Sequence, residues 1–456
     1  MIKKSILLFS VNTAGRAFQY LYRVIMSHFL TLQQFGVLSA ALPYQSFILL
    51  FTSMSITPTV SKFTSQYKVD SKEKIFNVFS LLLLGVITGG ILYVSAPGIA
   101  SFFGAEFTDV IYLLKVFSGT VPFAVLLSIC TGIFLGFQKA RLMAVVLLVY
   151  QCIMLFLSYI LVQYLGLQGA PLGILFSYII SGCVAVVLVT TFRISRNVSL
   201  FDIVKIFRFS LPVLVGVLGL WGLLNVDTLI LARFVPAEFV GVYGQAYPTA
   251  RLVFGFSAAL SALLIPKVSE LTQKGEDTHA SIRRSFEVCA LVTVPITVVI
   301  AAFSQEILYV LFGNAAGFKS LQILSMGMLV YSLFFVGYSA LQGMGHPEYS
   351  MGVAAGCAVL NIILCFVLIP RFGIVGAAVS TSISCLIGLI SVLVLLKVTF
   401  LPRIYYVVVL LPLFVFEKYT GILNTRITTM VIYGLFGIPF LLLYFYLSKK
   451  YLRTQE

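Results

Sequence analysis

Apolar stretches long enough to cross a membrane follow one another along almost the whole chain. A membrane-spanning helix needs about 20 predominantly apolar residues, and 60% of the 456 residues are hydrophobic, which is enough for roughly 13 or 14 such helices. Only 10% of the residues are charged, whereas soluble domains average about 25%. The sequence therefore predicts an all-α integral membrane protein. It excludes a nucleic-acid-binding module, a secreted disulfide scaffold and most soluble enzymes.

The positions of these stretches predict fourteen transmembrane helices, of which the last two form a terminal hairpin. Their predicted ranges are 5–28, 36–60, 75–103, 110–137, 142–163, 169–192, 209–232, 240–266, 286–312, 320–344, 349–369, 374–396, 404–420 and 427–448. The connections between them are short and leave no room for a soluble catalytic domain. We therefore expect a transporter and no enzyme.

The basic residues predict the orientation of these helices. With the N-terminus placed in the cytoplasm, 21 of the 30 Lys and Arg residues lie in inner segments, five lie in outer segments and four lie inside spans. Cytoplasmic loops of membrane proteins carry an excess of Lys and Arg. The distribution predicts a multi-pass protein of the cell (cytoplasmic) membrane with both termini in the cytoplasm, and it accounts for the net charge of +15.

The seven cysteines and three histidines are scattered, and the cysteines lie inside apolar stretches without metal-ligand spacing. We expect no metal site and no cofactor.

The two halves of the chain repeat each other. Four pairs share an offset of 207 residues: Gly136 and Gly343, Gly166 and Gly373, Gly169 and Gly376, and Ser177 and Ser384. Pro58 and Pro266 are 208 residues apart, and Gly36 and Gly241 are 205 apart. Each repeat holds six spans, an even number, so both halves have the same orientation. The predicted domains are an N-terminal lobe (1–195), a C-terminal lobe (196–400) and a hairpin with a short tail (401–456). Such paired bundles are typical of transporters.

Polar residues line one face of the first span. Asn12, Arg16, Gln19 and Arg23 follow the spacing i, i+4, i+7, i+11. A charged residue at the middle of a membrane helix costs about 2.5–3.5 kcal/mol on insertion scales. The face is therefore expected to meet protein or water.

The eighth predicted span, 240–266, carries Tyr243, Tyr247 and Arg251 at intervals of four. The seventh, 209–232, carries Asp227. One interpretation is a cationic cavity between the halves, where Arg16, Arg23 and Arg251 bind phosphate, because the guanidinium group suits bidentate phosphate binding. The other is structural: Arg23 pairs with Asp227, and the other two arginines bond to backbone carbonyls. Pro248, three residues before Arg251, removes a backbone hydrogen bond and is expected to kink the helix.

Several motifs together resemble a known superfamily. They are Leu341-Gln-Gly-Met-Gly345, Ile369-Pro-Arg-Phe-Gly373-Ile-Val-Gly376, Arg16…Tyr22-Arg23 with Phe35-Gly36, and Ala246-Tyr-Pro with Pro266-Lys-Val-Ser-Glu270. The pattern resembles the polysaccharide-flippase (Wzx-like) branch of the multidrug/oligosaccharidyl-lipid/polysaccharide exporter superfamily, and the likeness covers essentially the whole chain.

The resemblance implies alternating access and movement of a lipid-linked glycan from the inner to the outer leaflet, for export of cell-surface polysaccharide. It implies that Arg16, Arg23 and Arg251 line the cavity that binds the substrate. Asn12, on the polar face of the first span, and Tyr247, an aromatic ring able to stack on a sugar, are the further candidates for substrate binding. The expected partners are the lipid-linked oligosaccharide, membrane lipids and polysaccharide assembly proteins, with the chain itself a monomer and no nucleic acid bound.

Two alternatives stay open. One is a flippase for a peptidoglycan precursor (lipid II). The other is an ion-coupled multidrug exporter with Asp227 as the coupling acid, although the first span holds no Asp or Glu, which are typical of the cation sites of such exporters.

Overall fold

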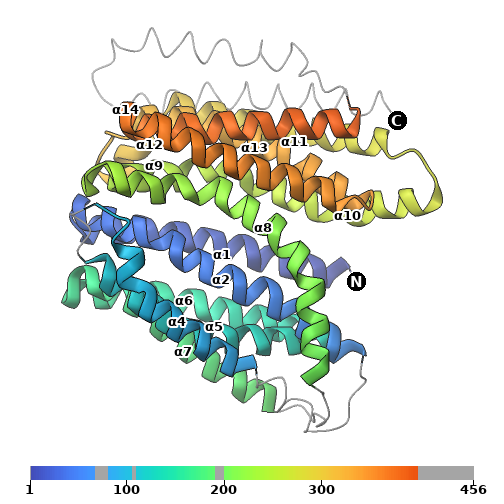
Figure 1. Cartoon of the computed structure of the whole chain (residues 1–456), viewed down its shortest axis with the longest axis horizontal. Coiled ribbons are helices and arrows are strands. Elements are labelled where there is room, and N and C mark those ends of the chain that lie inside the picture. The colour runs from blue at the N-terminus through green and yellow to red at the C-terminus, as the bar shows by residue number, and fades with distance from the viewer. Residues whose placement is uncertain (1, 67–80, 105–108, 191–199, 399–456) are drawn as a thin grey trace. The chain divides into compact units, whose positions relative to one another are not determined.

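The computed structural model describes residues 2–66, 81–104, 109–190 and 200–398. Within these ranges the chain is helical almost throughout and contains no β-strand (Figure 1). By their contacts the residues form two compact units, Met1–Gln245 and Ala246–Glu456. The first unit contains α1 (Ile2–Phe29), α2 (Leu32–Gln66), α4 (Leu81–Ala100), α5 (Val110–Gly136), α6 (Ala140–Leu165), the short 3₁₀ turn η2 (Gly166–Gln168), α7 (Gly169–Thr190), α8 (Leu200–Phe234) and most of α9 (Ala237–Ala250).

The second unit begins in the last turns of α9. It then contains η3 (Arg251–Phe254), α10 (Gly255–Lys274), α11 (His279–Ala302), α12 (Ser304–Phe312), α13 (Phe318–Gly343) and α14 (Pro347–Leu396). Within the described residues each of the predicted spans 1 to 12 overlaps a helix, and the predicted span 286–312 is broken at Phe303 between α11 and α12. The last two spans and the hairpin 401–456 lie outside the described residues. The division into lobes at residue 195 stays a prediction.

Eight helical stretches among the described residues are long and apolar enough to cross a membrane. Two of these stretches, 140–190 and 347–396, each contain two predicted spans. The observation agrees with a multi-pass membrane protein whose helices follow one another with short turns.

Each unit is built around the fourth helix of its repeat. In the first unit α5 packs against α2, α4 and α7, while α1 packs on α6. In the second unit α13 packs against α10, α11 and α14. These are the helices that the repeat places at equivalent positions, so the packing inside the two units supports the internal repeat.

Two glycines turn the chain between consecutive helices in the same way. Gly166 has φ 55° and ψ −134°, and Gly373, 207 residues later, has φ 55° and ψ −132°. Only glycine adopts this region readily, because a Cβ atom would collide with the backbone. Gly169 and Gly376 then sit against the carbonyl oxygens of Leu161 and Leu368. The sequence repeat is thus a repeat of backbone geometry.

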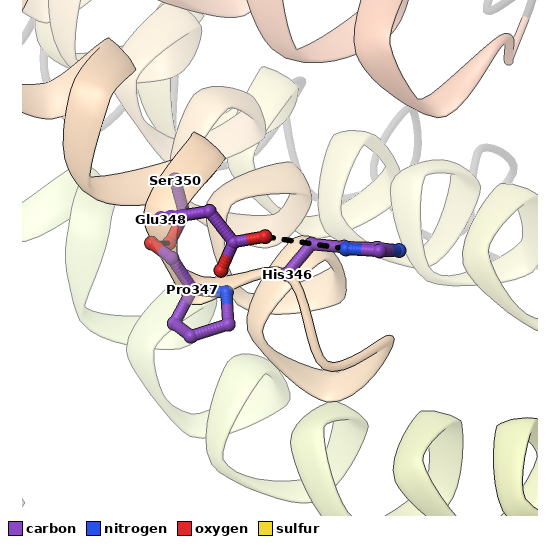
Figure 2. Close-up of polar contacts among 4 residues, drawn as sticks. All are labelled: His346, Pro347, Glu348 and Ser350. Carbon is purple, nitrogen blue, oxygen red and sulfur yellow. Dashed lines mark hydrogen bonds and ion pairs between the residues drawn. The ribbon is translucent and has the colours of Figure 1, made fainter.

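A tight turn also separates α13 from α14 (Figure 2). Gly345 has φ +84°, and Pro347 follows as the first residue of α14. The Ser350 hydroxyl donates to the Pro347 carbonyl over 2.8 Å, and the His346 Nδ1 atom lies 3.4 Å from Glu348 Oε1 in an exposed pair. Proline suits the first turn of a helix, where its missing N–H has no partner to lose.

Candidate functional site

The predicted polar face of the first span lies on one continuous helix. α1 contains Asn12, Arg16, Gln19 and Arg23. Arg16 and Gln19 are exposed and Arg23 is half-buried, whereas the side chain of Asn12 lies outside the described residues. The structure confirms the helical spacing, which brings these positions to one side of α1.

A different face of α1 anchors the helix to its neighbours. The buried Tyr22 hydroxyl donates to the Ala170 carbonyl of α7 over 3.3 Å. A Cβ atom at Gly15 would lie 3.1 Å from the Gln151 side-chain amide of α6, so glycine permits the close approach of these two helices. These two contacts fix α1 against α6 and α7.

Asp227 lies at the centre of a hydrogen-bond cluster between α8 and α9. Its side chain is fully buried. It accepts hydrogen bonds from the Tyr243 hydroxyl over 2.5 Å and from the Thr228 backbone N–H over 2.7 Å. The Thr228 hydroxyl lies 3.3 Å away. A buried carboxylate needs such donors, and here they connect two helices of the first unit.

The second unit contains an irregular helix at Arg251. α9 includes Pro248, and the chain then tightens into the 3₁₀ turn η3, which begins at Arg251. Proline lacks the N–H that would bond to the carbonyl four residues earlier, which weakens the α-helical pattern at this point. α9 itself continues through Pro248 to Ala250, so the kink expected at Pro248 stays a prediction.

Arg251 and Tyr247 form a cation–π pair. The Arg251 Cζ atom lies 5.1 Å from the centroid of the Tyr247 ring. Tyr247 is buried and Arg251 is half-buried. Such a pair contributes about 0.5–2 kcal/mol, more where water is excluded. The Tyr247 ring therefore supports the Arg251 guanidinium group.

A cluster of aromatic rings lies beside this pair. Phe254 of η3 makes edge-to-face contacts with Tyr331 and Phe335 of α13, at centroid distances of 4.9 and 5.0 Å. Phe335 in turn stacks on Tyr338 at 5.8 Å with an interplanar angle of 11°. The sequence interpretation had considered Tyr247 but missed Phe254 and Phe335. The signal for Phe254 was its place three residues after Arg251, which brings the two side chains to one face of a helix and aligns them in a 3₁₀ turn.

The first unit contains a cavity that the sequence did not indicate. Its volume is 510 Å³, within the range of about 300–1,000 Å³ typical of ligand pockets. The lining comes from α2, α5, α6, α7 and α8, and all of the lining residues are uncharged. The polar ones are Thr57, Ser128, Thr131, Tyr150, Gln151 and Tyr178.

The described residues contain no group of three or more His, Cys, Asp or Glu side chains able to hold a metal ion. The structure brings Tyr247 and Arg251 together in the second unit. Arg16, Arg23, Asn12 and Asp227 belong to the first unit.

The sequence of this chain matches a known protein family. The sequence model of a family described as polysaccharide biosynthesis protein matches residues 1–272, which is more than half of the chain. The chain belongs to this family. A second model, MatE, matches residues 212–367 of this polysaccharide biosynthesis family protein.

Its relatives include proteins from archaea and bacteria. An uncharacterized membrane protein of Methanocaldococcus jannaschii is 26% identical over 87% of this chain and 98% of its own length. A Haloferax volcanii protein named "Probable low-salt glycan biosynthesis flippase Agl15" is 30% identical over 40% of this chain and 39% of its own length. The capsular polysaccharide biosynthesis protein CapF of Staphylococcus aureus is 23% identical over 86% of this chain and 98% of its own length.

Two solved structures show the fold. The lipid II flippase MurJ, in an inward closed conformation, has a TM-score of 0.80 at 17% identity and covers 98% of this chain and 99% of its own. An inward-facing multidrug transporter of the MATE family has a TM-score of 0.69 at 15% identity and covers 84% of this chain and 94% of its own. The family protein therefore has the fold of the exporter superfamily, and its assignment to the polysaccharide-flippase branch is confirmed.

Proposed function

We propose that this protein moves a polyprenyl-diphosphate-linked oligosaccharide from the inner to the outer leaflet of the cytoplasmic membrane, for export of cell-surface polysaccharide. The observation that carries the proposal is the Arg251–Tyr247 pair at the break in a predicted membrane span. An arginine at that depth is costly unless it has a function or a partner. Arginine also matches the geometry of diphosphate oxygens.

The roles of the site residues follow from their chemistry. In this proposal Arg16 and Arg251 bind the diphosphate, and Arg23 and Asn12 contribute to binding of the same ligand. Tyr247 supports Arg251 and contacts the headgroup. The names of the Agl15 and CapF relatives support a glycan substrate.

The proposed architecture has fourteen membrane helices, with lobes 1–195 and 196–400, a hairpin 401–456 and both termini in the cytoplasm. Alternating access of the two lobes then exposes the headgroup first inside and later outside. The protein works as a monomer on a lipid substrate and performs no covalent chemistry. If net negative charge moves outward with the substrate, an inside-negative potential assists by about 2.3 kcal/mol per charge per 100 mV.

Two other functions have specific support. The high structural similarity to a lipid II flippase favours a peptidoglycan-precursor substrate as the second candidate. The MatE match over residues 212–367, which includes Asp227, favours an ion-coupled exporter of small molecules as the third.

The test is headgroup translocation in proteoliposomes with a fluorescent polyprenyl-diphosphate disaccharide. We expect the double variant Arg16→Ala/Arg251→Ala to lose at least about tenfold in rate, because each hydrogen bond to a charged group contributes about 1.5–3 kcal/mol. Arg371→Ala is the matched control, because Arg371 is exposed and lies in a predicted outer segment.

Unchanged flipping in the double variant would contradict the diphosphate site. If the wild-type protein does not translocate the lipid but transports a cationic dye, the result would favour the exporter of small molecules instead. Replacing the disaccharide by a lipid II analogue separates the first two candidates.

A further inference from the structure

Two phenylalanines present their rings at the surface of an otherwise buried aromatic cluster. Phe254 and Phe335 are half-buried, whereas Tyr331 and Tyr338 are 2% and 4% exposed. All four rings belong to the second unit and lie within contact distance of a neighbour in the cluster. Part of each phenylalanine side chain is therefore accessible at the surface.

The 3₁₀ geometry of η3 places Phe254 beside Arg251. In a 3₁₀ helix the side chains at i and i+3 eclipse each other, and the rise of about 2.0 Å per residue separates them by about 6 Å along the axis. Arg251 and Phe254 are the first and last residues of this turn. In a regular α-helix the same two side chains would diverge by about 60° around the axis, as 3.6 residues per turn requires.

The two buried tyrosine rings pack against the half-buried phenylalanine rings, Tyr331 against Phe254 and Tyr338 against Phe335. Phe254 stands almost perpendicular to Phe335, at 88°. Phe335 lies nearly parallel to Tyr338, at 11°. Aromatic pairs in such geometries attract each other beyond the effect of burial alone. The rings are thus pre-organised, and a ligand that packs against them does not have to order them first.

The chemistry of this surface fits a neutral sugar next to a phosphate. The face of an aromatic ring carries partial negative charge, and the C–H groups on the face of a pyranose ring carry partial positive charge. In a polyprenyl-diphosphate glycan the first sugar is joined directly to the diphosphate. An arginine for the phosphate and an aromatic surface one turn away match that order of groups.

We infer that Phe254 and Phe335 form a stacking surface for the sugar attached directly to the diphosphate, while Arg251 binds the diphosphate itself. The inference rests on the proposed function and adds the part of the substrate that these rings recognise. Phe254 and Phe335 then determine specificity for a glycosylated lipid over the bare prenyl diphosphate.

The test compares two ligands on the purified full chain: a short-chain prenyl-diphosphate disaccharide and the same prenyl diphosphate without sugar. We expect Phe254→Leu and Phe335→Leu to weaken binding of the glycosylated ligand about three- to tenfold. Binding of the ligand without sugar should stay within twofold of the wild type, a limit set by about 0.4 kcal/mol. Arg251→Ala should weaken both ligands, and Phe254→Tyr, which keeps the ring, should restore discrimination.

Phe366→Leu is the control, because Phe366 is 46% exposed on α14 and belongs to no part of the cluster described above. If the two leucine variants weakened binding of both ligands equally, the inference would be overturned, because the rings would then stabilise the fold and not recognise the sugar. Unchanged binding of both ligands by the two variants would also overturn the inference.

Translocation of the disaccharide lipid by the wild type, measured in parallel, separates the two proposals. If the wild type flips the lipid but binds both ligands equally well, the sugar surface is wrong and the flippase function stands. If it neither binds nor flips the glycosylated lipid, the proposed function fails and the sugar surface fails with it.

Discussion

Gly36 and Gly241 occupy equivalent positions in the internal repeat, and they lie against each other where α2 crosses α9 inside the first unit. A Cβ atom at Gly36 would overlap the Ala237 carbonyl, and one at Gly241 would overlap the Leu32 carbonyl. Leu32 and Ala237 are separated by the same 205 residues as the two glycines. The crossing is therefore symmetric in the repeat, with each glycine facing the backbone of the other helix.

This crossing predicts that Gly36→Ala destabilises the protein. The added methyl group meets a backbone oxygen, which cannot rotate away, so we expect a loss of about 1–3 kcal/mol, as for overpacked cores. The measurement is the apparent Tm of the detergent-purified variant. Gly90→Ala is the matched control: it lies in α4 with no atom within 4 Å of the added Cβ, and its Tm should stay the same or rise. A Tm of Gly36→Ala equal to that of the wild type would show that the helices can separate freely.

The shared backbone geometry of Gly166 and Gly373 predicts equal effects of alanine at both positions. Nothing lies within 4 Å of a Cβ at either position, so the cost comes from the backbone angles alone, about 1–3 kcal/mol each. We expect both single variants to lower the apparent Tm and the double variant to lower it by the sum, because the sites belong to different units. Gly356→Ala, with open space and ordinary helical angles, serves as the control. A large difference between the two single variants would contradict the equivalence.

The Tyr243–Asp227 hydrogen bond predicts a stability defect in Tyr243→Phe. The variant removes a donor from a fully buried carboxylate, which costs about 1–3 kcal/mol. The apparent Tm of thermal unfolding in detergent measures this loss of stability. The control is Tyr309→Phe, because Tyr309 is 49% exposed on α12. If Tyr243→Phe unfolds at the wild-type temperature, this bond contributes little to the α8–α9 contact.

Asp227→Asn separates a structural role from ion coupling. Asparagine can still accept from the Thr228 N–H, and the Tyr243 hydroxyl can rotate to accept from the new amide. We therefore expect a small fall in Tm and transport close to that of the wild type. Complete loss of transport in a variant of normal stability would instead favour the coupling acid of an ion-driven exporter.

The Arg251–Tyr247 pair predicts that lysine cannot replace Arg251 fully. Lysine keeps the positive charge but lacks the planar fork that binds two oxygens at once. We expect Arg251→Lys to flip the diphosphate lipid about tenfold more slowly, the effect of about 1.4 kcal/mol, and Arg251→Ala to be slower still. Arg371→Lys is the control, because it replaces an arginine by lysine outside the proposed site. Equal rates for Arg251→Lys and the wild type would mean that only the charge matters.

The sequence was enough to predict the helix positions, the repeat, and the spacing of Arg16, Arg23 and Arg251. Each of these features depends on local properties of the chain. Apolar length marks a span, period 3.6 places residues on a face, and a constant offset marks duplicated helices. The same local signals predict a kink at Pro248, whereas the irregular turn in the structure begins three residues later at Arg251. Substrate roles for these residues stay predictions.

Contacts between helices could not be read in this way. The sequence paired Gly136 with Gly343, yet Gly343 lies against Ile265 and Val268, whereas in the first unit Gly132 lies against the equivalent Thr57 and Val60. One helical turn separates Gly132 from Gly136, so both register choices present the same helix face. A sequence pattern that repeats every turn cannot distinguish them.

The sequence by itself thus determined the membrane class, the helices, their duplication and the residues that carry charge. Tertiary structure alone decided that Tyr243 donates to Asp227, that Phe254 and Phe335 join the Arg251 region, and that an uncharged cavity lies within the first unit. The physical reason is that hydrophobic length and periodicity belong to one segment, whereas a hydrogen bond or ring contact depends on where two segments cross. Close packing fixes that crossing through steric fit over many residues at once.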